Sequence, residues 1–147
     1  MERKIKNFFD LEVWKKAHQF VIQIYKITKD FPREEQFGLT SQLRRAVISI
    51  SANIAEGFER YHFKDKIRFY YQARGSIGEA HNFLLLAKGL RFIKKEDYAK
   101  LEKWLEELRK LLNGVIRSTE KTKRSTLITR YQLLVTSYYR YEKNFNR

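Results

Sequence analysis

Hydrophobic residues recur at helical spacing in four long stretches of the chain. In residues 39–58 the sequence LTSQLRRAVISISANIAEGF places apolar side chains at 4-4-3-4-4 intervals, the period of a helix buried along one stripe. Similar stripes run through residues 10–30, 64–88 and 95–119, and short connections separate the four stretches. The pattern predicts an all-α fold, an antiparallel up-and-down four-helix bundle over residues 8–119.

Local signals give the expected ends of these helices. Asp10 is the expected N-cap of the first helix, because its carboxylate can accept from the free amides of the first turn. Pro32 forces Phe31 out of the helical region and so ends that helix. Thr40 is the expected cap of the second helix, which should extend to about Tyr61.

Glycines inside the expected helices indicate close packing. Gly57 fits either a C-cap or a point of close backbone approach, and both alternatives stay open. Gly75 and Gly78 each cost about 1 kcal/mol relative to Ala within a helix, so a packing reason is expected. With nearby Ala and Ser residues they form a small-residue patch. Another helix could approach this patch, either within the subunit or across an interface.

A second face of the 39–58 helix is polar, where a plain bundle helix would be apolar. Arg45, Ser49, Asn53 and Glu56 follow at 4-4-3 spacing and form what we call the polar ladder. Such a row is costly to bury unless its members are paired, so it either faces water or meets polar partners. We predict a structural ladder, in which replacing Asn53 or Glu56 by Ala costs on the order of 1–3 kcal/mol.

Residues 118–147 differ in composition from the rest. They hold seven Lys and Arg against two Glu, with four Tyr. Apolar residues at 4-3-4-3 spacing permit a fifth helix, but a β-favouring VTSYYRY segment weakens that interpretation. A mobile basic tail that orders on binding is equally open. We therefore expect residues 120–147 to be a basic, Tyr-rich C-terminal extension of the bundle.

Composition narrows the class of protein. The 147 residues amount to about one domain, and the absence of Cys excludes a disulfide scaffold, thiolate catalysis and a cysteine zinc site. The N-terminus has no apolar signal region, and the longest strongly apolar run, residues 83–87, is too short to cross a membrane. A soluble cytoplasmic protein is expected. Its net charge of +14 favours a polyanionic partner, with nucleic acid as the first candidate. Basicity without such a role, or attraction to an anionic membrane surface, is the alternative.

The histidines and sequence motifs give little support to an enzyme. A di-iron bundle needs two Glu-x-x-His motifs on facing helices, and Glu59 to His62 is the only one here. His18 is isolated, and His81 follows Glu79 by two residues, which places them on different helix faces. No metalloprotease, P-loop, dinucleotide or nucleophile-elbow motif occurs. We expect no catalytic residue, no metal and no cofactor.

Two basic clusters are the better candidates for a functional site. The first lies at the junction of the second and third helices, where aromatic residues interleave with cations in a way that suits phosphate contact and base stacking. Aromatic residues at this spacing are, however, more often core or interface. The second cluster follows the fourth helix. The nucleic-acid-binding candidates are Arg60, Lys64, Lys66 and Arg68 in the first cluster, and Arg117, Lys121, Lys123 and Arg124 in the second.

Four segments carry a resemblance to a known family: FFDLEVWKKA at 8–17, DFP at 30–32, the 39–58 stretch with its NIAEG pentapeptide, and ARGSIGEA at 73–80. The chain resembles the four helix bundle proteins encoded in intervening sequences of bacterial 23S rRNA genes, and is similar to the accessory protein of diversity-generating retroelements. Ser51 stands where that family often has proline. The resemblance covers residues 8–118 and implies a bundle, commonly a ring-like homopentamer, without known enzymatic activity and with an RNA-binding role.

Two hypotheses from different classes follow. The first is a non-enzymatic, oligomeric adaptor that binds RNA or DNA, RNA being favoured, and delivers it to a protein partner such as a reverse transcriptase. The second is a purely structural homo-oligomer, or a docking module for an acidic protein. Both include self-association, because apolar and aromatic surface exceeds one seam per helix. The residues expected to supply this surplus are Trp14, Phe69, Trp104 and Leu111.

Overall fold

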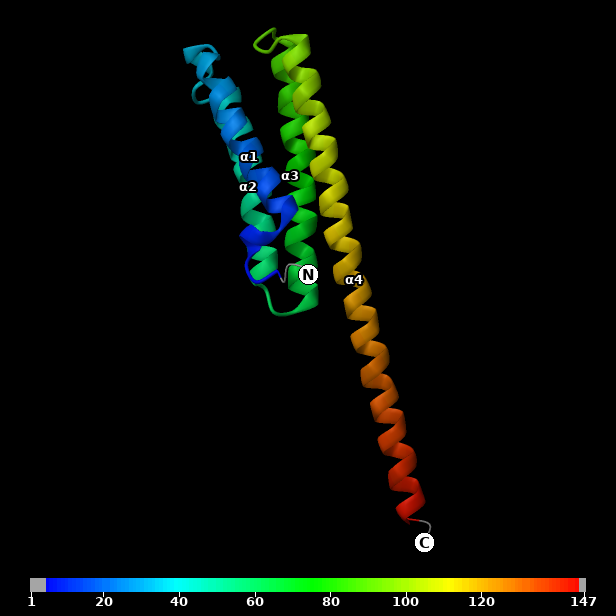
Figure 1. Cartoon of the computed structure of the whole chain (residues 1–147). Coiled ribbons are helices and arrows are strands. Elements are labelled where there is room, and N and C mark those ends of the chain that lie inside the picture. The colour runs from blue at the N-terminus through cyan, green and yellow to red at the C-terminus, as the bar shows by residue number, and fades with distance from the viewer. Residues whose placement is uncertain (1–4, 146–147) are drawn as a thin grey trace.

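The computed structural model describes the backbone of residues 5–145 and the side chains of residues 5–134. In this part of the chain there are four α-helices and no strand, which confirms the all-α prediction. Consecutive helices run in alternate directions (Figure 1). The helices are α1 (Glu12–Ile27), α2 (Leu39–Glu59), α3 (Phe63–Gly89) and α4 (Lys95–Phe145).

One hydrophobic core runs between the helices. The central contact is between α2 and α3, while α1 packs mainly on α2 and α4 mainly on α3. The predicted apolar stripes face this core because each helix buries one row of aliphatic and aromatic side chains. The largest fully buried side chains include Phe20 of α1, Ile50 of α2, Leu84 of α3 and Leu108 of α4.

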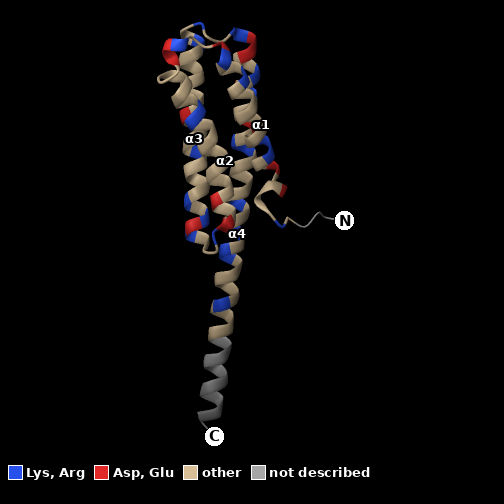
Figure 2. Ribbon diagram, turned by 90° about the vertical axis from the view of Figure 1, so that its left-hand side faces the viewer, with Lys and Arg blue, Asp and Glu red and all other residues tan. Residues whose placement is uncertain are grey.

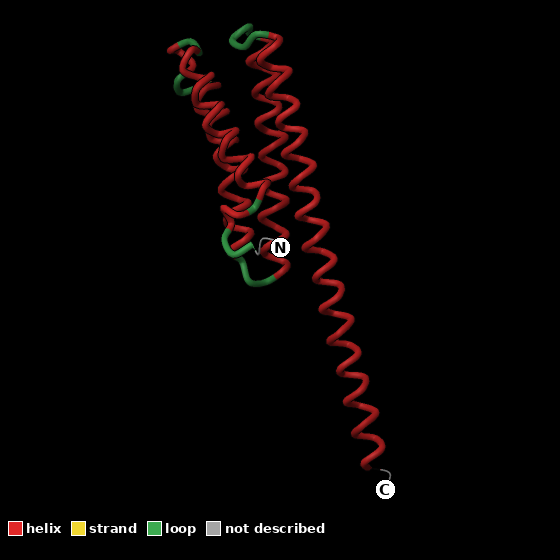
Figure 3. Tube along the Cα trace, in the orientation of Figure 1, coloured by secondary structure: helices red, strands yellow, loops and turns green. Residues whose placement is uncertain are grey.

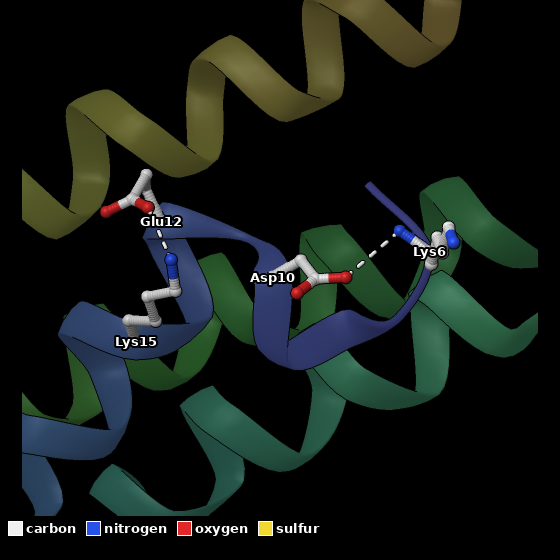
Figure 4. Close-up of polar contacts among 4 residues, drawn as sticks. All are labelled: Lys6, Asp10, Glu12 and Lys15. Carbon is white, nitrogen blue, oxygen red and sulfur yellow. Dashed lines mark hydrogen bonds and ion pairs between the residues drawn. The ribbon is translucent and has the colours of Figure 1, made fainter. Parts of the chain in front are cut away.

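The start of α1 differs from the prediction. The helix begins at Glu12 with Leu11 at the N-cap position, and no side chain caps it. The Asp10 carboxylate instead accepts the backbone N–H group of Lys6 (Figure 4) and that of Asn7, each at 3.0 Å. Asp10 is the last residue of the 3-10 turn η1 (Phe8–Asp10), which precedes α1. The prediction that Asp10 caps α1 is therefore wrong. The carboxylate binds amides that precede α1, because the chain before the helix places the N–H groups of Lys6 and Asn7 next to it.

In the connection from α1 to α2, the end of the first helix agrees with the prediction, but the N-cap of α2 differs from it. Phe31 is extended before Pro32, with φ −70° and ψ 151°, so the first helix ends as expected after the short turn η2 (Thr28–Asp30). Gly38, not Thr40, lies at the N-cap of α2, and the Glu35 carboxylate accepts the Leu39 amide at 2.9 Å. The prediction of a Thr40 cap is wrong.

Thr40 lies within the first turn of α2. Its side chain is 5% exposed, and its hydroxyl has no hydrogen-bond partner among the described residues. At the other end, α2 stops at Glu59, two residues before the predicted end at Tyr61. Helix ends commonly differ by this amount from a sequence-based boundary.

Gly57 is a point of close approach between α2 and α3. A Cβ atom at this position would lie 2.7 Å from Cε1 of Tyr70 and 3.2 Å from the carbonyl oxygen of Lys66. This resolves the two alternatives for Gly57 in favour of packing. Gly75 and Gly78 behave differently, because a Cβ at either would meet no other atom within 4 Å in the described chain. The expected packing reason for these two glycines is not found within the subunit.

The polar ladder has two half-buried members, Ser49 and Asn53, and two exposed members, Arg45 and Glu56. Ser49 Oγ lies 2.8 Å from Ser76 Oγ of α3, and Asn53 Nδ2 donates to the Ser49 carbonyl and hydroxyl at 2.8 and 3.0 Å. Arg45 and Glu56 are exposed. Glu56 pairs with Arg60 on the surface, and Arg45 makes no ion pair or hydrogen bond with the described residues. Only the middle of the ladder thus joins two helices.

The fourth helix continues far past its predicted end near residue 119. α4 has 51 residues, which corresponds to about 75 Å at 1.5 Å per residue. Residues 120–145 form neither a separate fifth helix nor a structurally distinct tail, because they prolong α4 without a break and project beyond the bundle (Figures 1 and 3). The side chains of Tyr138 and Tyr141, which complete the apolar spacing of the extension, lie outside the described residues.

Candidate nucleic-acid interface

The two basic clusters meet at one end of the bundle. The connection between α2 and α3, residues 60–62, lies at the end where α4 leaves the other helices (Figure 1). A pocket of about 580 Å³ is lined by residues of this corner and by residues of α4 from Lys123 onward. The clusters are separated by about fifty residues in sequence, and the antiparallel return of α4 brings them together.

The corner cluster contains three cations on the surface. Arg60 forms an ion pair with Glu56, and its guanidinium lies over the Phe69 ring at 4.8 Å from the centroid. Arg68 approaches the same ring at 5.3 Å. Lys64 is exposed at the start of α3. Phe69 is therefore covered by two guanidinium groups and belongs to the charged surface.

Lys66 has a different role from its neighbours. Its ammonium donates to the backbone carbonyls of Gly57 and Phe58 at 3.0 and 2.7 Å, and thereby satisfies the C-terminus of α2. Burial lowers the pKa of Lys66, and the Glu59 charge offsets part of this effect. Because two of its three N–H donors are used within the fold and the side chain is half-buried, Lys66 has a structural role that its exposed neighbours do not have.

The aromatic residues of the corner divide in the same way. Tyr70 is 3% exposed and packs against Gly57, so it belongs to the core. Tyr71 is half-exposed, and its hydroxyl donates to Glu120 of α4 at 3.3 Å. Tyr61 is 91% exposed, and Phe63 is half-buried beside the pocket. Tyr61 offers an exposed ring that a base could contact, and Phe63 contributes a half-buried ring to the pocket.

The second cluster lies on two faces of α4. Arg117, Lys121 and Arg124 share one face with the carboxylate of Glu120. Lys123 lies on the face that prolongs the core stripe, seven residues after the buried Ile116. As a result Lys123 faces the start of α3.

Sequence reasoning missed Arg130 and Leu127. Both line the pocket together with Lys123, because residues 123, 127 and 130 lie on one side of the helix. The signal that could have found them is the seven-residue spacing from Ile116 through Lys123 to Arg130. That spacing becomes informative only if α4 is continuous.

The charged side chains of the projecting part of α4 are all positive between residues 121 and 134. Between residues 121 and 134 there are four cations and no Asp or Glu. Figure 2 shows Lys and Arg along the described part of α4 below the bundle, whereas basic and acidic residues are mixed at the opposite end. The four cations are Lys121, Lys123, Arg124 and Arg130.

The histidines do not form a metal site in the described chain. No group of three or more His, Asp or Glu side chains there is placed to hold a metal ion. His81 Nε2 lies 3.1 Å from the Tyr98 hydroxyl, which donates to Glu102 at 2.9 Å, so this histidine joins α3 to α4. His18 stacks on Trp14, and the His62 ring contacts Tyr61 edge-on.

Among the described residues, no helix is long and apolar enough to cross a membrane.

The exposed apolar surface of the bundle lies only partly on the residues predicted to supply it. Trp14 and Trp104 pack against the core of their own chain, and Trp104 contacts Phe20 at a centroid distance of 5.6 Å. Leu111 is 38% exposed, as expected of a contact surface. Other aliphatic side chains on the bundle are more exposed and were not singled out from the sequence; they include Ile22, Ile48, Leu85, Leu86 and Leu90.

Comparisons with known proteins agree with this architecture. A solved structure from Bacteroides thetaiotaomicron VPI-5482, described as a protein of unknown function from the S23 ribosomal protein family, is 27% identical with a TM-score of 0.67. The match covers 71% of this chain and 95% of that chain. A comparison with curated proteins gave no match. The family model described as 23S rRNA-intervening sequence protein matches residues 9–114, which include three complete helices and most of the bundled part of α4. The chain belongs to the 23S rRNA-intervening sequence protein family.

Proposed function

We propose that this protein is a non-enzymatic, oligomeric adaptor that binds nucleic acid, with RNA as the preferred ligand. The observation that supports the proposal is the convergence of the two basic clusters at one end of the bundle, where α4 projects into solvent. Clustered cations on a surface attract the phosphate backbone and account for most sequence-independent affinity. None of these residues reads sequence by itself, so recognition is mainly electrostatic and by shape.

Exposed aromatic rings favour RNA as the ligand. Sequence-independent binding of single strands combines cations with ring faces on which bases stack. Tyr61 is exposed at the corner, and Phe63 lies beside the basic pocket. RNA presents unpaired bases in loops, bulges and ends more often than duplex DNA does. The family description, which refers to intervening sequences of 23S rRNA genes, points in the same direction.

Self-association is part of the proposal, with a homopentamer implied by the family resemblance. Ile22 of α1, Ile48 of α2 and Leu85 of α3 are each more than 40% exposed. Aliphatic groups on several helices can be covered by copies of the same chain arranged around an axis. A ring would repeat the basic corner, and avidity would raise the affinity for a long polyanion.

A matched pair of triple variants tests nucleic-acid binding. The site variant replaces three exposed cations of the interface by Ala, and the control variant replaces three exposed cations at the opposite end of the bundle. Binding to a fluorescent RNA is measured by anisotropy over a salt series. The site variant is Lys64→Ala, Lys121→Ala and Arg124→Ala; the control is Lys29→Ala, Arg33→Ala and Lys94→Ala.

Both variants lower the net charge by three, so a difference in their RNA affinity must come from where the removed cations lie on the protein. We expect the slope of log K against log salt to fall by about 2 in the site variant, because each lost phosphate contact contributes roughly 0.7 to 0.9. The control should keep the wild-type slope. Absence of salt-sensitive binding by the wild-type protein would refute the proposal and favour the docking of an acidic protein. An equal loss in both variants would show that net charge, without a localised site, is responsible.

A further inference from the structure

We propose that the α2–α3 corner and the extension of α4 form a pocket for one unstacked nucleotide, which makes the protein prefer single-stranded or looped RNA over duplex. This inference rests on the proposed function and assigns a ligand class to one part of the interface. The extension that forms one wall lies beyond residue 114, where the family match ends. One wall of the pocket therefore lies within the matched region and the other lies outside it.

The pocket has two walls from distant parts of the sequence. The corner contributes His62, Phe63 and Lys64, and α4 contributes Lys123, Leu127 and Arg130. Its volume of about 580 Å³ falls within the range of roughly 300 to 1,000 Å³ that is usual for small-ligand sites. A single nucleotide is a ligand of that size class.

The chemistry of the walls matches both parts of a nucleotide. Phe63 presents an aromatic ring and Leu127, 55% exposed, an aliphatic group, so an inserted base would cover carbon that now faces water. Lys64 comes from one wall, and Lys123 and Arg130 come from the other. The phosphate of the same nucleotide can meet cations from both walls. Asp65 is the one carboxylate among the lining residues, so the pocket keeps a positive balance.

A duplex cannot use both features together. Its bases stay paired and stacked, and it offers the pocket only phosphates, which leaves the carbon of Phe63 and Leu127 exposed. An unpaired base can leave its stack at little cost and insert between the walls. Preference for an unpaired strand is therefore the expected signature, whereas surface cations alone would favour the duplex, because its phosphates are more densely spaced.

The test compares a single strand, a hairpin and a blunt duplex RNA with equal numbers of phosphates, each competing for the full-length protein at one salt concentration. Leu127→Gln removes the aliphatic wall without changing the charge and at an exposed position, so the fold should persist. Leu133→Gln is the matched control, because Leu133 is 66% exposed on the same helix and does not line the pocket.

We expect the wild-type protein to bind the single strand and the hairpin roughly tenfold more tightly than the duplex, the size of one base-stacking contact. Leu127→Gln should abolish most of this preference and leave duplex affinity unchanged, while Leu133→Gln should behave as wild type.

Equal wild-type affinity for single strand and duplex would overturn the pocket but leave the proposed function intact. An equal effect of both substitutions would also overturn it. Failure to bind any RNA would refute the proposed function itself. A polyglutamate peptide that binds and loses affinity in Leu127→Gln would assign the pocket to a protein partner.

Discussion

At the scale of single residues, the roles of polar and small side chains depend on what they meet in space. Lys64 and Lys66 are two positions apart in the same basic cluster, yet one is exposed and the other donates to the end of α2. Gly57 and Gly75 likewise both lie inside long helices. One faces the ring of Tyr70 at close range and the other faces open space. This difference gives the two glycines opposite responses to the same substitution.

Gly57→Ala should lower the free energy of unfolding by roughly 1–3 kcal/mol, because the new methyl group overlaps the Tyr70 ring in a packed interior. Gly75→Ala should raise it by about 0.5–1 kcal/mol, since Ala is the better helix former and nothing obstructs it. Urea unfolding of both variants measures this contrast. A stabilising Gly57→Ala would contradict the close approach. A Gly75→Ala variant that dissociates an oligomer would place the small-residue patch at an interface between subunits.

At the scale of elements, α4 is one continuous helix whose two halves differ in how much of their surface is buried. Its first half is anchored by buried residues from Tyr98 to Ile116. Beyond that point the described side chains are largely exposed, including Leu127 and Tyr131. The hydroxyls of four threonines, at 119, 122, 126 and 129, donate to carbonyls four residues earlier. Such bonds weaken a helix slightly, so the extension depends on the bundled half for its nucleation.

Hydrogen exchange should therefore show a gradient along α4. Amides between residues 101 and 116 should exchange only on global unfolding, because their helix face is buried in the core. Amides between 120 and 134 should exchange at least about a hundredfold faster, as expected for a helix without tertiary support. Mass spectrometry of peptides from the two halves measures the difference. Uniform protection along α4 in the free protein would mean that another copy covers the extension, and addition of RNA tests whether nucleic acid protects it.

At the scale of the whole molecule, alkaline pH should act on the core through two buried tyrosines. Burial raises the pKa of Tyr70 to about 12, and burial together with the Glu102 hydrogen bond and charge raises that of Tyr98 to about 12. The folded state holds these phenolic protons more tightly than the unfolded chain does. The stability they contribute is complete below about pH 10 and is lost as pH rises towards 12.

Urea unfolding between pH 9 and 11.5 should accordingly show falling stability, and Tyr70→Phe should flatten the fall. The buried Tyr70 alone accounts for on the order of 2 kcal/mol over the whole window, since one pKa unit corresponds to about 1.4 kcal/mol. Tyr61→Phe, at an exposed ring, is the control and should follow the wild type. The interpretation fails if Tyr70→Phe and Tyr61→Phe lose stability with the same slope as the wild-type protein.

The sequence by itself determined the helical class, the four amphipathic stripes and the break before Pro32. These features follow from local rules, because the period of apolar residues and the fixed geometry of proline act within a few positions of the chain. It also supplied the candidate residues of the two basic clusters, without Leu127 and Arg130. It placed the cap of α1 on Asp10 and that of α2 on Thr40, and both were wrong, since nearby turns supplied other groups.

Only the tertiary structure decided which polar residues are free to bind a ligand. The return of α4 past the α2–α3 corner placed Lys123 and Arg130 beside Lys64, and the packing of α2 on α3 turned Lys66 and Tyr70 inward. The length of α4 was likewise decided by continuity with a helix nucleated in the bundle, which the weak helix preference of residues 118–147 did not reveal. The periodicity of a helix is local, whereas exposure and neighbouring charge depend on residues far apart in the chain.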